Sequence, residues 1–233
     1  MRLADRDVLV VGGTGALGRA VCLVLLAEGA RVVASGRRPG EYAALLEAAG
    51  GAAGRLAFVQ ADVSEPAQAA RAVEEAARGG RLAAVVNTAG GWAGGASIGE
   101  EPAERLAAML AANLAPAHAL VRAAVPALAR AGGGAIVQVA SSAAAGPQPG
   151  QAAYGAAKAA VTSLLLSLAE EVRPQHIRVN VVLPGTMDTE ANRRATPGAD
   201  RSGWVPTAEV ARVITFLCSD DARAVTGAAI PVR

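Results

Sequence analysis

The sequence is poor in aromatic side chains and cysteine. Phe, Trp and Tyr together make up 3% of the 233 residues, and there are two cysteines. A core must therefore be built mainly from aliphatic residues and alanine, which suits helices packed closely on a sheet. Cys22 and Cys218 lie far apart in apolar segments, which predicts two small buried side chains, with neither a disulfide framework nor a metal cluster.

The net charge is also small, and long apolar runs are absent. The formal net charge is +2, and the arginines are scattered, without a block that would follow a phosphate backbone. No run of about 18 apolar residues is free of charges and helix breakers, and the N-terminus lacks the form of a signal peptide. We therefore expect a soluble, cytoplasmic protein that binds neither nucleic acid nor membrane.

Short segments rich in Val, Ile and Ala are present along the whole chain and alternate with helical segments. Strands that are apolar on both faces and alternate with helices are typical of a parallel sheet. We therefore predict an α/β, Rossmann-type doubly wound sheet of about seven strands with helices on both faces, as a single domain over residues 1–233. The predicted strands are DVLVVGG, RVVASG, LAFVQAD, LAAVVNTAG, AIVQVAS, IRVNVVLPG and AAIPV.

The loop after the first strand is rich in glycine. Glycines at a strand-to-helix turn let backbone N–H groups approach a pyrophosphate, and the following helix N-terminus favours its charge. This predicts dinucleotide binding by Gly12, Gly13, Thr14, Gly15, Ala16, Leu17 and Gly18. The alternative is a tight turn without a ligand. Gly13, Gly15 and Gly18 satisfy G-x-G-x-x-G, while Gly12 and Ala16 suggest a longer loop.

The loops after the second and third strands bear on which dinucleotide binds. An acidic residue after the second strand favours NAD(H), whereas this chain has Gly36, Arg37 and Arg38. Two guanidiniums suit a 2′-phosphate, so NADP(H) is preferred over NAD(H). A solvated arginine pair is the alternative. Asp62, followed by Val63, is a candidate to accept a hydrogen bond from the adenine amino group, or else to cap the next helix.

The only lysine of the chain, Lys158, stands four residues after Tyr154, one of two tyrosines. Positions i and i+4 share one face of a helix, and the Ala- and Leu-rich run around them, ended by Pro174, is typical of a helix. The two rare side chains are therefore expected to be neighbours. A Tyr-x-x-x-Lys spacing also arises by chance, so its meaning depends on the other motifs.

Taken in order, these motifs resemble the short-chain dehydrogenase/reductase family over nearly the whole chain. The others are NTAG after the fourth strand, an Asn in the following long helix, a Ser thirteen residues before the Tyr, and PG after the sixth strand. The resemblance implies catalytic roles for Asn113, Ser141, Tyr154 and Lys158. It also implies cofactor contacts by Asn87, Ala89, Gly90, Tyr154, Lys158, Pro184, Gly185 and Thr189.

The expected chemistry explains these residue types. Hydride addition to a carbonyl leaves negative charge on oxygen, which a hydroxyl donor neutralises in the transition state. Tyr154 would supply that proton, and Ser141 would hold the oxygen. Lys158 is the compact charge that favours phenolate and reaches the nicotinamide ribose, which a planar guanidinium would do poorly.

Three stretches resemble one branch more closely, the dihydropteridine reductases: GGTGALG, AGGWAGG and DTEANRRATPGADRSGW. Trp92 and Trp204 lie in the latter two, as surfaces for a planar substrate or as hydrophobic lids. That branch has an acidic residue after the second strand and lacks the active-site serine. Ser142 and Arg193 are further candidate substrate contacts, and a solvated surface pair is the alternative for Arg193 and Arg194.

We therefore expect an NADP(H)-linked enzyme that interconverts a carbonyl and an alcohol on a small molecule without a metal. Residues 186–205 are expected to form a mobile substrate lid. Pterin reduction is the runner-up, and a catalytically silent NADP(H)-binding sensor or scaffold is the alternative of another class. The resemblance also implies self-association as a homotetramer or homodimer.

Overall fold

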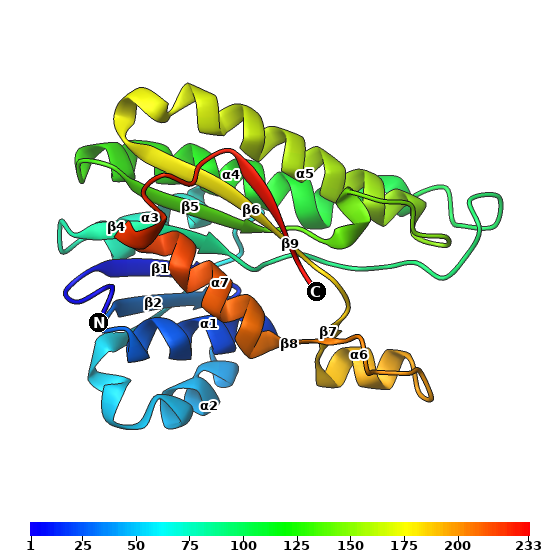
Figure 1. The fold of residues 1–233 in the computed structure, drawn as a ribbon, viewed down its shortest axis with the longest axis horizontal. Helices are drawn as coiled ribbons and strands as arrows, with labels where there is room; N and C mark the ends of the chain where they lie inside the picture. Colours follow the sequence, from blue (N-terminus) through cyan, green and yellow to red (C-terminus); the bar gives the residue numbers. More distant parts are fainter.

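Seven parallel strands form one continuous sheet in the computed structural model, which describes all residues from Met1 to Arg233 (Figure 1). The strands lie in the order β3-β2-β1-β4-β5-β6-β9, and every neighbouring pair is parallel. This confirms the predicted doubly wound sheet. Their bounds are β1 Asp7–Val11, β2 Arg31–Gly36, β3 Leu56–Gln60, β4 Leu82–Asn87, β5 Gly134–Val139, β6 Ile177–Pro184 and β9 Ala228–Val232.

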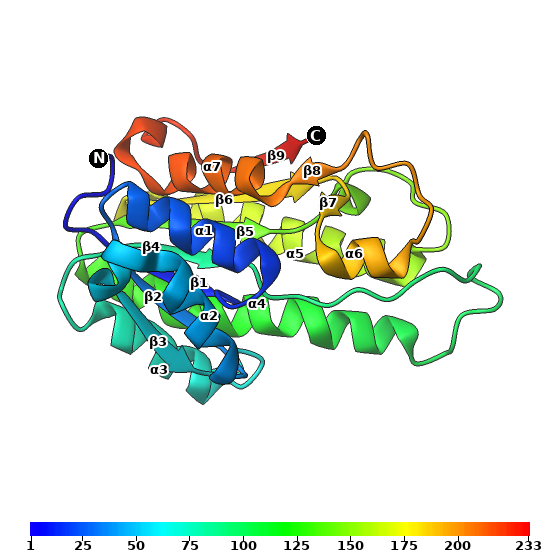
Figure 2. The same cartoon turned by 90° about the horizontal axis from the view of Figure 1, so that it is seen from below.

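Helices cover both faces of the sheet (Figure 2). One face carries α1 (Ala16–Ala27), α2 (Gly40–Ala49) and α7 (Thr207–Cys218). The other carries α3 (Pro66–Ala77), α4 (Arg105–Arg130) and α5 (Ala152–Glu171). Each connection between neighbouring parallel strands therefore crosses over through a helix, as parallel pairing requires.

Two hydrophobic cores lie on opposite faces of the sheet, and successive strand residues point alternately into them. In β1, Val8 and Val10 pack beneath α1 and α7, while Leu9 and Val11 pack beneath α3 and α4. Both faces of the strand are therefore dry, which explains its unbroken apolar sequence. Cys22 and Cys218 are buried and free, and burial raises the pKa of each thiol to about 12, as expected for inert core residues.

The two longest helices, α4 and α5, have the length and composition of a membrane span. In the structure they lie beside each other on one face of the sheet (Figure 1), and each contributes residues to the core beneath them. Core packing therefore accounts for their apolar character.

The segment expected to be a lid, residues 186–205, has regular structure although its sequence lacks clear periodicity. The two-residue strands β7 (Met187–Asp188) and β8 (Val205–Pro206) pair in parallel and flank the short helix α6 (Glu190–Ala195). Thr189 begins that helix, and its hydroxyl accepts a hydrogen bond from the Asn192 N–H at 3.2 Å. Figure 1 shows this segment standing out from the body of the molecule.

The strand order reverses between β1 and β4, so the connections that leave these two strands run to opposite sides of the sheet. A crevice opens at such a point, outside the carboxyl ends of the strands. The loops after β1, β2, β3 and β4, which carry the predicted cofactor residues, line one cleft there.

Candidate functional site

Two adjoining cavities lie at the carboxyl ends of the strands. The first, called here the cofactor cleft, has a volume of about 400 Å³. It brings together many of the predicted cofactor residues from four loops that are far apart in the sequence. Its wall includes Gly12, Thr14, Gly15, Gly36, Arg37, Arg38, Glu41, Asp62, Val63, Ser64, Thr88, Ala89, Gly90 and Pro116.

The glycine-rich turn requires glycine for geometric reasons. Gly12 has φ +73°, and a Cβ there would lie 2.8 Å from the Thr88 Oγ1. A Cβ on Gly18 would overlap the carbonyl oxygen of Gly12, so α1 packs directly on the turn. Gly18 and Leu17 lie buried behind the wall of the cleft, where they shape the turn without lining it.

The arginine pair after β2 lies at the rim of the cofactor cleft. Arg37 is exposed, and Arg38 forms an ion pair with Glu41 of α2 at 2.6 Å. Glu41 also accepts a hydrogen bond from the Thr14 hydroxyl at 3.0 Å. Arg38 is therefore tied to the glycine-rich turn through a carboxylate.

Asp62 is held by its own loop. Its Oδ1 accepts hydrogen bonds from the Ser64 N–H at 3.0 Å and the Ser64 hydroxyl at 2.6 Å. These two bonds hold the pKa of the Asp62 carboxyl below its ordinary value. The carboxylate is thus positioned on the wall of the cleft, and it does not cap α3, which begins at Pro66 after Glu65.

The loop after β4 is fixed by two buried asparagines. Asn87 donates to the Gln138 Oε1 of β5 at 2.9 Å and accepts from the Ala89 N–H at 3.0 Å. Asn113 of α4 donates to the carbonyls of Gly91 and Met109 and accepts from the Gly91 N–H. Both amides are thus engaged within the chain, and they hold the loop in place.

Gly90 lies between this loop and the rare lysine. A Cβ on Gly90 would stand 2.7 Å from the Asn113 Oδ1 and 3.0 Å from the Lys158 Nζ. The structure therefore brings Gly90, Asn113 and Lys158 together, and a larger residue at position 90 would have to displace the Asn113 amide.

Tyr154 and Lys158 lie on one face of α5, as the i, i+4 spacing predicts. The Lys158 Nζ is 5.7 Å from the centre of the Tyr154 ring. Burial lowers the pKa of Lys158 to about 8 and raises that of Tyr154, and a hydrogen bond with Ser141 partly offsets the latter rise. The phenol therefore keeps its proton at neutral pH, beside a lysine that is still mostly charged.

Ser141 faces Tyr154 from the end of β5. Its Oγ accepts a hydrogen bond from the Ala143 N–H at 3.2 Å, and Ser141 is thereby the N-cap of the short 3-10 helix Ser142–Ala144. Because that bond uses only the acceptor side of the oxygen, the hydroxyl hydrogen can donate to the Tyr154 oxygen, a bond that lowers the Tyr154 pKa, or to a substrate oxygen. Ser141 is thus fixed in place and retains a donor.

The second cavity, called here the substrate cavity, has a volume of about 320 Å³ and adjoins Ser141 and Tyr154. Tyr154 is the only ionisable side chain in its wall. The Trp92 indole N–H donates to the Gln151 Oε1 at 3.3 Å across its rim, while 56% of Trp92 stays exposed. The wall comprises Trp92, Ala140, Ser141, Ser142, Ala143, Gln148, Gln151, Tyr154, Pro184, Gly185, Thr186, Met187, Asn192, Ala195 and Thr196.

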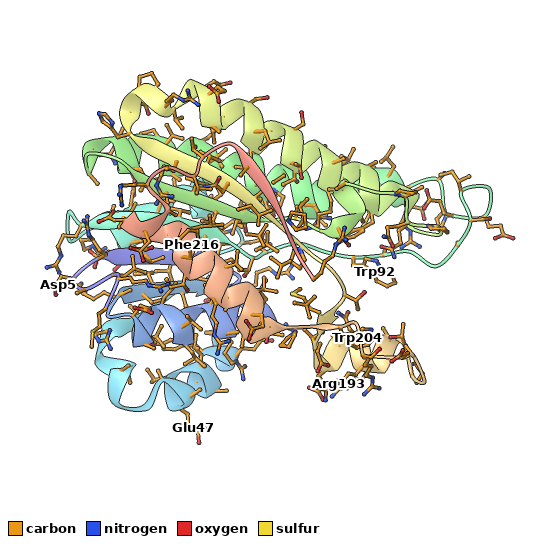
Figure 3. All side chains as sticks on the ribbon, in the orientation of Figure 1. Asp5, Glu47, Trp92, Arg193, Trp204 and Phe216 are labelled. Atoms are coloured by element: carbon orange, nitrogen blue, oxygen red, sulfur yellow. The ribbon has the colours of Figure 1, made fainter.

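Ten predicted residues lie outside both walls: Gly13, Ala16, Leu17, Gly18, Asn87, Asn113, Lys158, Thr189, Arg193 and Trp204. Arg193 forms an ion pair with Asp188 at 2.6 Å, and Trp204 lies against the Arg201 guanidinium, 5.6 Å from the ring centre. Figure 3 shows Arg193 and Trp204 on the outlying α6 segment, while Trp92 lies on the separate loop before α4. Thr189 is the N-cap of α6.

Sequence reasoning missed Glu41, Gln138, Gln151 and Asn192. Glu41 comes five residues after the end of β2, inside a helix, where no loop motif marks it. Gln138 faces Asn87 in the β4–β5 register, a pairing that only the sheet order reveals. A glutamine within a strand of otherwise apolar residues was the one available signal for it.

The cofactor cleft fits a dinucleotide. Its glycine turn leads into the N-terminus of α1, which favours bound phosphate. Lys158 is 6% exposed, and its ammonium, beside Gly90 of the cofactor cleft, donates no hydrogen bond within the chain, so its donors remain for a ligand. The guanidiniums at the far end suit an additional phosphate.

Comparison with known proteins agrees with this arrangement. The model of the short chain dehydrogenase family matches residues 6–200. The 2,5-dichloro-2,5-cyclohexadiene-1,4-diol dehydrogenase LinX of Sphingobium indicum is 30% identical over 239 residues, covering 99% of this chain and 96% of the relative.

Two solved structures share the fold. A short-chain type dehydrogenase/reductase from Mycobacterium ulcerans superposes with a TM-score of 0.93 at 31% identity, covering 100% of this chain and 90% of the other. ElxO with NADP bound superposes with a TM-score of 0.92 at 23% identity, covering 98% and 97%. On the family match, the full-length relative and the shared fold, this chain belongs to the short-chain dehydrogenase/reductase family.

Proposed function

We propose that the protein transfers hydride between NADP(H) and a small uncharged carbonyl or alcohol, with Tyr154 as the general acid and base. The observation that carries this proposal is the arrangement of three side chains: Ser141 and Tyr154 line the substrate cavity, and the Lys158 Nζ lies 5.7 Å from the Tyr154 ring centre, beside Gly90 of the cofactor cleft. A protein that only binds a dinucleotide would need neither the buried lysine nor the phenol.

The cofactor, when bound, supplies the hydride. The chain's own residues handle the proton: the Ser141 hydroxyl donates to the substrate oxygen, and the Tyr154 phenol delivers its proton as negative charge grows there. The raised pKa of Tyr154 keeps the phenol protonated for reduction. The Lys158 ammonium stabilises the phenolate that remains.

The glycine turn, Asp62, Val63, Ala89 and Gly90 would hold the dinucleotide, with Pro184 and Gly185 beside its reactive end. Asn87 and Asn113 act as positioning residues, because their amides hold the β4 loop against Lys158. Arg37 and Arg38 would contact the 2′-phosphate, and the preference for NADP(H) over NAD(H) rests on them.

The lack of a charged side chain in the substrate cavity favours an uncharged substrate. Arg193 is neutralised by Asp188 and Arg194 pairs with Glu190, so neither arginine is free for an anionic group. LinX, named for a cyclic diol, supports an alcohol or ketone of this kind. Pterin reduction is a second candidate, favoured by Trp92 at the rim, whereas Ser141 favours a carbonyl.

The test is a spectrophotometric panel of NADPH oxidation with cyclic diketones, quinones, a β-ketoacyl thioester and quinonoid dihydropterin, and NADP⁺ reduction with cyclic diols. We expect turnover with uncharged cyclic carbonyls and diols. Turnover of the dihydropterin alone would favour the second candidate. Tight NADPH binding with no turnover of any compound would contradict the enzymatic proposal and indicate a sensor or scaffold.

We further propose that the protein acts in the cytoplasm as a homotetramer or homodimer. Light scattering of the purified chain measures the assembly directly, and a monomer at micromolar concentration would contradict it.

A further inference from the structure

Glu41 lines the cofactor cleft beside the arginine pair to which the proposed function assigns the 2′-phosphate. Its carboxylate lies 2.6 Å from the Arg38 guanidinium and 3.0 Å from the Thr14 hydroxyl of the glycine turn. Both partners line the cofactor cleft, as does Glu41 itself. An anion of the chain therefore already uses the guanidinium that would receive the phosphate.

The local charge differs from what the arginine pair alone suggests. Arg37 and Arg38 contribute two positive charges, and Glu41 removes one, so this end of the cleft carries a net charge of one. Asp62 is a second carboxylate in the wall of the same cleft, and its pKa is held below its ordinary value chiefly by the Ser64 hydrogen bonds, with a smaller contribution from the Arg37 charge. Like charges held close together at a partly buried site repel each other, so a carboxylate beside a phosphate weakens the binding of that phosphate.

We infer that Glu41 is a cofactor-selectivity residue: it competes with the 2′-phosphate for Arg38 and limits the preference for NADP(H), so that the native protein also accepts NAD(H). The inference rests on the proposed use of a nicotinamide dinucleotide. With NADP(H) bound, Arg38 must exchange its carboxylate partner for the phosphate. With NAD(H), the Arg38–Glu41–Thr14 chain of contacts stays intact.

The discriminating variant is Glu41→Gln, which removes the charge and keeps the shape and the hydrogen-bonding capacity toward Thr14. The matched control is Glu47→Gln on the same helix. Glu47 is exposed and points away from the body of the protein (Figure 3). The control substitution therefore removes an equal charge outside the cleft. The readout is the dissociation constant of NADPH and of NADH by fluorescence titration, with calorimetry of 2′,5′-ADP and ADP as simpler ligands.

We expect Glu41→Gln to tighten NADPH and 2′,5′-ADP about tenfold, in line with the loss of one screened repulsion. The same variant should change NADH and ADP by less than about threefold, and Glu47→Gln should change all four ligands by less than about twofold, because exposed charges are screened. An unchanged or weakened NADPH affinity in Glu41→Gln, or equal tightening of both cofactors, would overturn the inference and leave the proposed function standing. If the native protein bound neither NADPH nor NADH, the proposed function would be overturned, and this inference with it.

Discussion

The two halves of the crevice are built differently. The cofactor half is made by strand-end glycines such as Gly12 and is held by the buried, hydrogen-bonded amides of Asn87 and Asn113. The substrate half takes residues from α5, from the outlying α6 segment and from surface loops, and its largest side chain, Trp92, is 56% exposed. The first half is fixed by backbone geometry, while the second is open to change without disturbing the fold.

Tyr154 and Lys158 lie where the two halves meet, on a helix whose other face packs in the core. Burial raises the pKa of Tyr154 and lowers that of Lys158, so it favours the uncharged form of each side chain. The catalytic pair is therefore placed at a cost in stability, which is usual for functional groups.

Gly18→Ala should have the largest effect, because it attacks the backbone of the cofactor half. The added methyl would overlap the Gly12 carbonyl oxygen, and forcing such a contact costs about 1–3 kcal/mol of folding free energy. We expect cofactor binding to be lost along with this stability, as measured by titration and thermal melting. Gly54→Ala is the matched control, since nothing lies within 4 Å of a Cβ there; an equal loss in both variants would refute the geometric argument.

Lys158→Met should separate activity from stability. The pKa of Lys158 falls from 10.5 to about 8, which corresponds to roughly 3 kcal/mol of cost for burying the ammonium. We therefore expect the variant to lose about 100-fold or more in activity while its free energy of unfolding at pH 7 rises by roughly 2–3 kcal/mol.

The control for Lys158→Met is how its stability relative to the native protein changes with pH. Below pH 8 the lysine is charged in both the folded and the unfolded state, so the burial cost is present in full. Between the folded value of about 8 and the unfolded value of 10.5, the folded state loses its proton first and the cost disappears. The stability advantage of the variant should shrink across this range in urea titrations, and a constant advantage would contradict the assignment.

Substitutions in the substrate half should have smaller effects, and these should appear in the KM for the substrate and not in the affinity for the cofactor. Gln151→Ala removes the hydrogen bond at the rim to Trp92, which is worth about 1 kcal/mol, so KM for the carbonyl should rise about fivefold. The dissociation constant of NADPH should stay within about twofold. A matching loss of cofactor affinity would show that the two halves are coupled.

Arg193→Ala should have the smallest effect. Its guanidinium pairs with Asp188 at the surface and lies outside both cavity walls; exposed pairs of this kind contribute little, because solvent screens them. We expect KM and kcat for an uncharged substrate within about twofold of the native values. A loss of tenfold or more would mean that α6 closes over the substrate through this residue.

The same contrast explains what could be predicted from the sequence. The seven strands and the Tyr154–Lys158 pair follow from local patterns, because a strand buried on both faces and an i, i+4 spacing are visible in the chain itself. Glu41 and Gln151 were missed, because their contacts with Arg38 and Trp92 depend on how a helix and a loop approach another element. Arg193 was a candidate substrate contact, with a solvated surface pair as the alternative, because its ion pair with Asp188 is not visible in the sequence.

The assignment of Tyr154 as acid and base is tested most directly by turnover of Tyr154→Phe at saturating NADPH, with the dissociation constant of NADPH measured alongside. Removing the phenol that transfers the proton should lower kcat about 1000-fold. NADPH binding should stay within about twofold, since the ring and the cleft are preserved. A kcat within tenfold of the native value would contradict the account.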